Sequence, residues 1–185
     1  AKIACINYVI EQKENFIEGP AIFAIRHESI WETLILIQEF NQPIFILKKE
    51  LLKIPLFGAM AKKVGTISID RDNGARSLIN IVGKVSEAIK NGHPVIIFPE
   101  GTRMASGETT PLKRGIALLY KKANCPVVPV IHNAGQFWPR HGFIKKPGIV
   151  VVRFLPPIAP GLSGEEFMNQ LNDVFCGEVE KFNNK

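Results

Sequence analysis

The sequence contains no apolar run long enough to cross a bilayer, for which roughly 18 consecutive apolar residues are needed. Cysteine is scarce: Cys5, Cys125 and Cys176 form no C-x-x-C pair, and no histidine is placed to complete a zinc site with them. We therefore expect no disulfide framework and no metal. We predict three buried or partly buried free thiols in a reducing compartment.

Several signatures of nucleotide, nucleic-acid and hydrolase chemistry are missing as well. There is no Walker A loop, no helix-turn-helix signature, no ribonucleoprotein-type aromatic strand and no Gly-x-Ser-x-Gly elbow. These absences disfavour a serine hydrolase and weaken the case for nucleic-acid recognition. One alternative stays open at this point, which is a non-enzymatic domain that binds anionic lipid or nucleic acid through basic side chains.

The composition is that of a folded, basic protein. The 185 residues are 46% hydrophobic and 22% charged, which supplies enough apolar surface for a core. The 23 lysines and arginines exceed the 17 aspartates and glutamates by 6, and no acidic residue lies between Glu108 and Glu165. Such a field of one sign suits phosphate groups, nucleic acid or anionic lipid, so charge alone does not identify the partner.

Short apolar runs alternate with segments of helical period. Strands are predicted over residues 3–10, 21–25, 44–47, 66–69, 95–98, 127–131 and 149–154, which are often β-branched and bounded by Gly, Pro or Asn. Apolar spacing predicts a helix between Asn73 and Asn91, and a capping box of Ser163 and Glu166 predicts another near the end. This alternation indicates an α/β fold with a mostly parallel central sheet flanked by helices, and we expect residues 1–185 to form a single domain.

The first polar site in apolar surroundings follows the predicted strand at 21–25. His27 lies at the strand end, where an imidazole can act as a general base if a carboxylate fixes its tautomer. Glu32, in the first turn of a helix that starts after this corner, can reach the ring. A plainer interpretation is that Ser29-x-x-Glu32 is a capping box and His27 an ordinary loop residue.

A second polar segment follows the predicted strand at 95–98. In Pro-Glu-Gly-Thr-Arg, residues 99–103, Gly101 permits close backbone approach, Thr102 offers a hydroxyl and Arg103 offers a planar fork that matches a phosphate. Such a turn is suited to holding an anion, although a tight turn with an exposed arginine is the plainer interpretation. The other three histidines have no paired acid at useful spacing, and we interpret them as loop or strand-edge residues: His93, His132 and His141.

Together these segments resemble the glycerophospholipid acyltransferases, specifically the bacterial 1-acylglycerol-3-phosphate acyltransferases. The resemblance rests on His-x4-acid at 27–32 and Phe-Pro-Glu-Gly-Thr-Arg at 98–103. Two further blocks look like those of the family: residues 48–71, which end in an arginine, and the apolar Pro-Val-Val-Pro-Val at 126–130. The four blocks stand in the family's order.

The resemblance implies a reaction and a set of site residues. A fatty acyl group would pass from an acyl-CoA or acyl carrier protein thioester to the free sn-2 hydroxyl of 1-acylglycerol 3-phosphate (lysophosphatidic acid), giving phosphatidic acid. His27 would be the general base and Glu32 would orient it, with no acyl-enzyme, bound cofactor or metal. The glycerol-phosphate group would be held by Arg71, Glu100, Gly101, Thr102, Arg103 and Lys113. The last block would line the acyl pocket or be structural: Val128, Pro129 and Val130.

The sequence departs from the family pattern around His27. Glu32 stands where Asp is usual and is one methylene longer, and Arg26 and Glu28 flank His27 where the family usually has Asn and often has Gln. Arg26 can pair with Glu28 or approach the acyl donor. The residues alone do not choose between these arrangements.

An apolar substrate also requires a membrane surface. Residues 48–63 mix apolar and lysine side chains, and residues 137–146 mix aromatic and basic ones, as at an anionic bilayer interface. The first segment also fits a core helix broken at Pro55. Family members often carry an apolar N-terminal helical segment that is not seen here. We therefore expect a domain at the cytoplasmic face of the cell membrane, peripheral or anchored by a segment absent from this chain, with no nucleic-acid partner.

Overall fold

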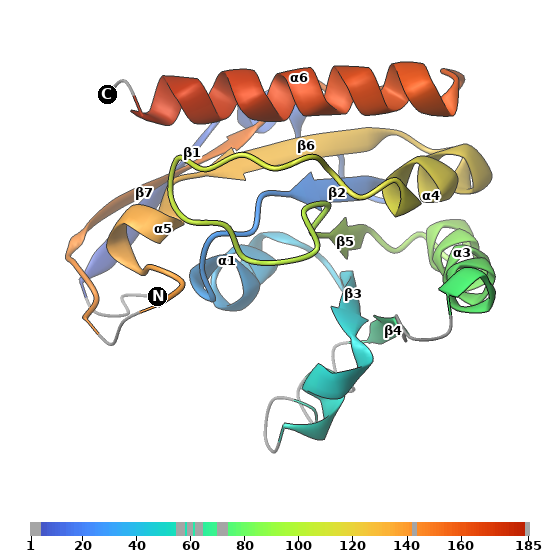
Figure 1. The fold of residues 1–185 in the computed structure, drawn as a ribbon, viewed down its shortest axis with the longest axis horizontal. Helices are drawn as coiled ribbons and strands as arrows, with labels where there is room; N and C mark the ends of the chain where they lie inside the picture. The colour runs from blue at the N-terminus through green and yellow to red at the C-terminus, as the bar shows by residue number, and fades with distance from the viewer. Residues whose placement is uncertain are drawn as a thin grey trace.

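The computed structural model of the chain describes residues 5–54, 58, 61, 65–69, 74–141 and 144–183, without the side chains of 74–77 and 183. In this part of the chain, seven strands form one sheet in the order β1-β7-β6-β2-β5-β3-β4 (Figure 1). The hydrogen-bonded neighbours run parallel, except β6 and β7, which are antiparallel. The prediction of an α/β fold with a mostly parallel sheet is confirmed.

Each predicted strand is present, with ends that differ from the prediction mainly at β1, whose expected first residues lie outside the described range. The strands are β1 (Ile6–Glu11), β2 (Ile22–Ile25), β3 (Ile44–Lys48), β4 (Thr66–Ile69), β5 (Val95–Ile97), β6 (Val127–His132) and β7 (Gly148–Phe154). The helices are η1 (Lys13–Asn15), α1 (Trp31–Leu34), η2 (Leu36–Glu39), η3 (Lys49–Lys53), α3 (Gly74–Lys90), α4 (Gly115–Ala123), α5 (Ala134–Phe137) and α6 (Gly164–Asn183).

The two faces of the sheet carry separate apolar layers. On one face, α3, α4 and α6 pack on side chains such as Ile22 and Ala24 of β2. On the other face, α1, η2 and α5 cover the alternate residues of the same strand, Phe23 and Ile25. Successive side chains of a strand point to opposite faces, so an unbroken apolar run is what a strand buried on both faces requires. Figure 1 shows α6 along the top of the sheet and α1 below it.

The helix ends follow the signals in the sequence. The predicted capping box at α6 is present: the Ser163 N–H donates to Glu166 Oε2 at 2.8 Å, and the Glu166 N–H donates to Ser163 Oγ at 3.1 Å. α3 ends where predicted, at Asn91 and Gly92, and Gly92 has a φ of 84°. Asn73, the expected N-cap of α3, lies outside the described residues.

The prediction that all three cysteines are buried or partly buried is wrong for two of them. Cys125 is buried, and burial raises the pKa of its thiol to about 11. Cys5 and Cys176 are exposed. Cys176 lies on α6 between apolar positions that face the sheet, and its own side of the helix faces solvent.

Candidate active site

The strand order brings distant segments together at one edge of the sheet. β2 lies between β6 and β5 and runs parallel to both, so the carboxyl ends of the three strands meet. β2 leads to His27, β5 leads to the 99–103 turn, and β6 ends at His132. In open α/β sheets this edge is where loops assemble binding sites.

His27 and Glu32 meet as predicted. Their atoms Nδ1 and Oε1 are 2.7 Å apart, with the Glu32 side chain fully buried and the His27 side chain 21% exposed. A neutral ring that donates from Nδ1 keeps Nε2 as the nitrogen able to accept a proton. The ring also stacks on Phe98, with centroids 4.1 Å apart. This is the geometry of a general base held by a carboxylate.

Glu32 also caps the start of α1. Its Oε1 accepts hydrogen bonds from the backbone N–H groups of Glu28 at 3.0 Å and Ser29 at 2.9 Å. Ser29 Oγ in turn accepts the Trp31 N–H at 3.1 Å. The Glu32–Ser29 bond of the plainer interpretation and the contact with His27 are both present, since one carboxylate oxygen serves both the backbone and the imidazole.

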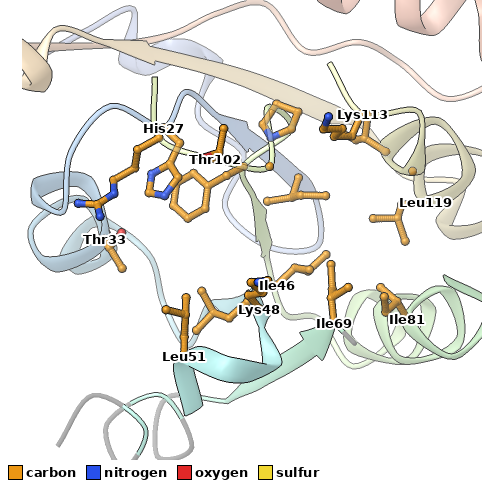
Figure 2. A pocket seen from close by; sticks show the side chains of 18 of the residues that line it. His27, Thr33, Ile46, Lys48, Leu51, Ile69, Ile81, Thr102, Lys113 and Leu119 are labelled. Carbon is orange, nitrogen blue, oxygen red and sulfur yellow. The ribbon is translucent and has the colours of Figure 1, made fainter. Parts of the chain in front are cut away.

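A cavity of about 600 Å³ opens in front of His27 (Figure 2). Four of the residues expected at the glycerol-phosphate site line this cavity: Gly101, Thr102, Arg103 and Lys113. Figure 2 shows His27, Thr102 and Lys113 along one border of this space. Arg71 lies outside the described residues.

The 99–103 turn has the tight backbone that its sequence indicates. Gly101 has a φ of 73°, which side chains with a Cβ rarely adopt, and its N–H donates to the Phe98 carbonyl at 3.0 Å. The Lys113 N–H donates to the Pro99 carbonyl at 2.8 Å, which ties the segment before α4 to this turn. Two cationic side chains therefore reach the cavity from segments joined by the backbone.

The far part of the cavity is apolar. Ile69, Ile81 and Leu119, from β4, α3 and α4, lie on the side away from His27 (Figure 2). Lys48, at the end of β3, also lines the cavity. It was expected in the family block at 48–71 and in the 48–63 segment, but not as a residue of the site. Of that block, Pro55 and its neighbours at 56–57 lie outside the described residues.

Buried charges lie beneath His27, and they include Glu100, which the family resemblance placed at the glycerol-phosphate site. Arg26 is 2% exposed and pairs with Glu28, with Nε 2.5 Å from Oε1. Glu100 is also 2% exposed and does not line the cavity; its Oε1 accepts the His27 N–H at 3.4 Å. Burial raises the pKa of Glu100 to about 7, and the charge of Arg26 opposes this rise.

The interpretation of His132 as a loop or strand-edge residue is wrong. It is 1% exposed at the end of β6, in the centre of the sheet. Its Nδ1 accepts the Ala134 N–H at 3.2 Å and its Nε2 donates to the Arg26 carbonyl at 2.7 Å, so the ring is the tautomer with a proton on Nε2. Nε2 is also 3.9 Å from Glu32 Oε2, which has no hydrogen-bond partner among the residues that the structure describes.

The apolar block at 126–130 forms β6, where it pairs with β2. Val128 and Val130 pack on the face covered by α1, and none of Val128, Pro129 and Val130 is among the residues that line the cavity. Their position is that of the framework that holds the His27 corner.

A known protein family matches the part of the chain that contains this site. The model of the family described as Acyltransferase matches residues 7–133, which include His27, Glu32 and the 99–103 turn. The chain belongs to the acyltransferase family. The match ends just after β6, so it covers the strands and loops that build the cavity.

Individual acyltransferases are similar over most of the chain. A 1-acyl-sn-glycerol-3-phosphate acyltransferase of Pseudomonas aeruginosa is 36% identical over 170 residues, which are 92% of this chain and 66% of that protein. One from Cocos nucifera is 26% identical over 88% of this chain and 54% of its own length. The chain thus spans about half to two thirds of these relatives.

A solved acyltransferase has the same fold. The crystal structure of the 1-acyl-sn-glycerophosphate acyltransferase PlsC from Thermotoga maritima superposes with a TM-score of 0.81 at 25% identity, covering 97% of this chain and 73% of that one. Among the helices described for the present chain, none is both long and apolar enough to cross a membrane.

Proposed function

We propose that this chain transfers a fatty acyl group from an acyl thioester to the free sn-2 hydroxyl of 1-acylglycerol 3-phosphate, giving phosphatidic acid. The observation that carries the proposal is the 2.7 Å contact of His27 with a buried carboxylate at a cavity that has cations at one side and apolar walls at the other. The names of the similar acyltransferases support the choice of acceptor.

The chemistry begins with proton transfer to His27. Nε2 takes the proton of the acceptor hydroxyl as its oxygen attacks the thioester carbonyl, and the Glu32 carboxylate stabilises the imidazolium that forms. The tetrahedral intermediate collapses with cleavage of the carbon–sulfur bond. The thiolate that leaves takes the proton from the imidazolium, so the products are the ester and the free thiol, and His27 is again neutral.

The phosphate of the acceptor is assigned to the cationic side of the cavity. Arg103 and Lys113 supply charge and the Thr102 hydroxyl supplies a donor, and a guanidinium can bind two phosphate oxygens at once. Arg71 is kept in this set as a proposal from the sequence. Convergence of these donors on one dianion would set the distance between the glycerol hydroxyl and His27.

The acyl chain is assigned to the apolar part of the cavity. Its walls come from β3, β4, β5, α3, α4 and η3, and they include buried core residues such as Ile46, Ile81 and Leu119. The thioester donor is acyl-CoA or acyl carrier protein. No cofactor or metal enters the proposed reaction.

Membrane contact is proposed for the segment around Trp138. The Lys145 ammonium lies 4.9 Å from the centre of the Trp138 ring, and the neighbouring Ile144 is 79% exposed. An aromatic ring, an exposed aliphatic side chain and basic residues suit the interface of an anionic bilayer. The proposed location is the cytoplasmic face of the cell membrane, peripheral or anchored by a segment that is not part of this chain.

The proposal is tested by phosphatidic acid formation from acyl thioester and lysophosphatidic acid, measured by mass spectrometry. His27→Ala should abolish product with little change in thermal unfolding, because His27 belongs to neither of the two apolar core layers. Arg103→Ala should mainly raise the KM for the acceptor. Binding of nucleic acid or anionic vesicles without acceptor-dependent turnover would instead identify a non-enzymatic binding domain.

A further inference from the structure

Arg26 is a buried cation next to His27, and the proposed reaction gives it no role. It stands between the last residue of β2 and His27, and its side chain is 2% exposed. A buried guanidinium is costly unless each of its donors finds a partner. Its partners therefore indicate what the side chain holds in place.

The guanidinium joins the His27 corner to the loop at 104–108. Nε donates to Glu28 Oε1, and Nη2 donates to the carbonyl oxygens of Glu108 at 2.5 Å and Ala105 at 3.4 Å. This loop continues directly from the turn that carries Thr102 and Arg103. One planar side chain thus spans the two segments that carry the base and the cations.

Backbone contacts hold the same junction from either side. The Met104 N–H donates to the His27 carbonyl at 2.7 Å. Both residues are sequence neighbours of the pair that the guanidinium joins, Arg26 and Ala105. Glu28, the partner of Arg26, uses its second oxygen to accept the Gly135 N–H at 3.0 Å, which fastens the pair to α5. The guanidinium therefore connects α5, through Glu28, with the 104–108 loop.

We propose that Arg26 is a positioning residue that fixes the distance between His27 and the phosphate-binding turn by clamping the 104–108 loop to the His27 corner. The phosphate part of this statement rests on the proposed function, whereas the clamp itself rests on the contacts of Arg26. Arg26 does not line the cavity in front of His27, so it acts through the loop and not on the substrate.

The main test is Arg26→Met, with Arg153→Met as a matched control. Arg153 is also a largely buried arginine paired with two carboxylates, Glu11 at 2.6 Å and Glu178 at 3.1 Å, but it joins β7 to β1 and α6, away from the cavity. Both substitutions remove a cation from the carboxylates it pairs with, although Glu178 keeps Lys181, and both should lower the melting temperature. Each variant is therefore assayed well below its own melting temperature.

Arg26→Met should lower kcat and raise the KM for lysophosphatidic acid, with kcat/KM falling at least about tenfold, because small displacements of reacting groups are costly. The KM for the thioester donor should stay unchanged, and Arg153→Met should stay within threefold of the parent. Equal losses in both variants, or a loss below threefold in Arg26→Met, would overturn the proposal.

Hydrogen exchange gives a readout that does not depend on the reaction. In Arg26→Met the Met104 amide, which donates to the His27 carbonyl, should exchange at least about tenfold faster than in the parent and in Arg153→Met. Unchanged protection of Met104 overturns the clamp. A parent protein that forms no phosphatidic acid would refute the proposed function alone, since the exchange result would still decide the role of Arg26.

Arg26→Lys keeps the test open if Arg26→Met does not fold. Lysine retains the positive charge beside Glu28, but its single nitrogen lacks the fork that reaches the carboxylate and the loop carbonyls together. Loss of Met104 protection with a fall in kcat/KM supports the clamp. Full protection and parental kinetics in Arg26→Lys would show that charge alone suffices, and the proposal would fail.

Discussion

Removing the charge of Glu32 while keeping its hydrogen bonds should lower kcat by about three orders of magnitude. Glu32→Gln keeps the length of the side chain and an oxygen that can accept the hydrogen bonds that Oε1 accepts now. What it removes is the negative charge 2.7 Å from His27 Nδ1. In the proposed reaction that charge faces an imidazolium in the transition state and a neutral ring before it.

The magnitude follows from the burial of the pair. With the centres of charge roughly 4 Å apart and an effective dielectric constant of about 20, the interaction is about 4 kcal/mol. A barrier higher by about 4 kcal/mol corresponds to roughly a thousandfold lower kcat. The KM for either substrate should change little, since the charge acts only after the proton has moved.

The chain supplies its own control for this substitution. Glu166 makes a comparable bond before α6: it accepts the Ser163 N–H at 2.8 Å, three residues back in the chain, as Glu32 accepts the Ser29 N–H at 2.9 Å. Glu166→Gln should leave kcat unchanged. Phosphatidic acid formation is followed for both variants at saturating substrate, with circular dichroism to establish folding. A kcat within tenfold of the parent in Glu32→Gln would show that the carboxylate is a helix cap and no more.

Three further outcomes are expected. Burial raises the pKa of Glu100 to about 7, so the folded state keeps a proton that the unfolded state loses near pH 4.5. The free energy of unfolding should therefore fall by about 3 kcal/mol as the pH rises from 4.5 to 7, and urea titrations of Glu100→Gln should lack this fall. His132→Leu, which removes the donor to the Arg26 carbonyl, should lower kcat about tenfold at unchanged substrate KM, and His132→Gln, which keeps a donor there, should restore most of it. Leu119→Trp should fill the apolar part of the cavity and lower turnover of long-chain more than short-chain thioesters, which competition between two donors would reveal.

The sheet could be predicted because its signals are local. Each strand is a short apolar run between residues that break regular structure, and burial on both faces removes any need for alternation. α4 was not predicted, because it has only nine residues, begins at Gly115 and mixes its buried positions with two lysines in the last turn. Its apolar face becomes visible only once α3 and α6 are packed beside it.

In the site too, contacts between residues close in the sequence could be predicted, and contacts between distant segments could not. His27 and Glu32 are five residues apart, so a corner followed by a helical turn is enough to predict their meeting. The contact of His132 with the Arg26 carbonyl joins residues 106 positions apart, and it exists only because β6 lies beside β2. No spacing rule could have found it, since the acceptor is a backbone atom that every residue has.

The three contacts of Glu32 Oε1 explain why a glutamate suits position 32. The oxygen lies within hydrogen-bond distance of the His27 ring and of two backbone N–H groups, at residues 28 and 29. These donors come from the corner that precedes α1, so the carboxylate has to reach back from the first turn of the helix across that corner. The bonds that start α1 thereby also fix the ring plane and tautomer of the base. A corner held in this way cannot loosen without loss of the catalytic geometry, because the same carboxylate oxygen anchors both the backbone and the imidazole.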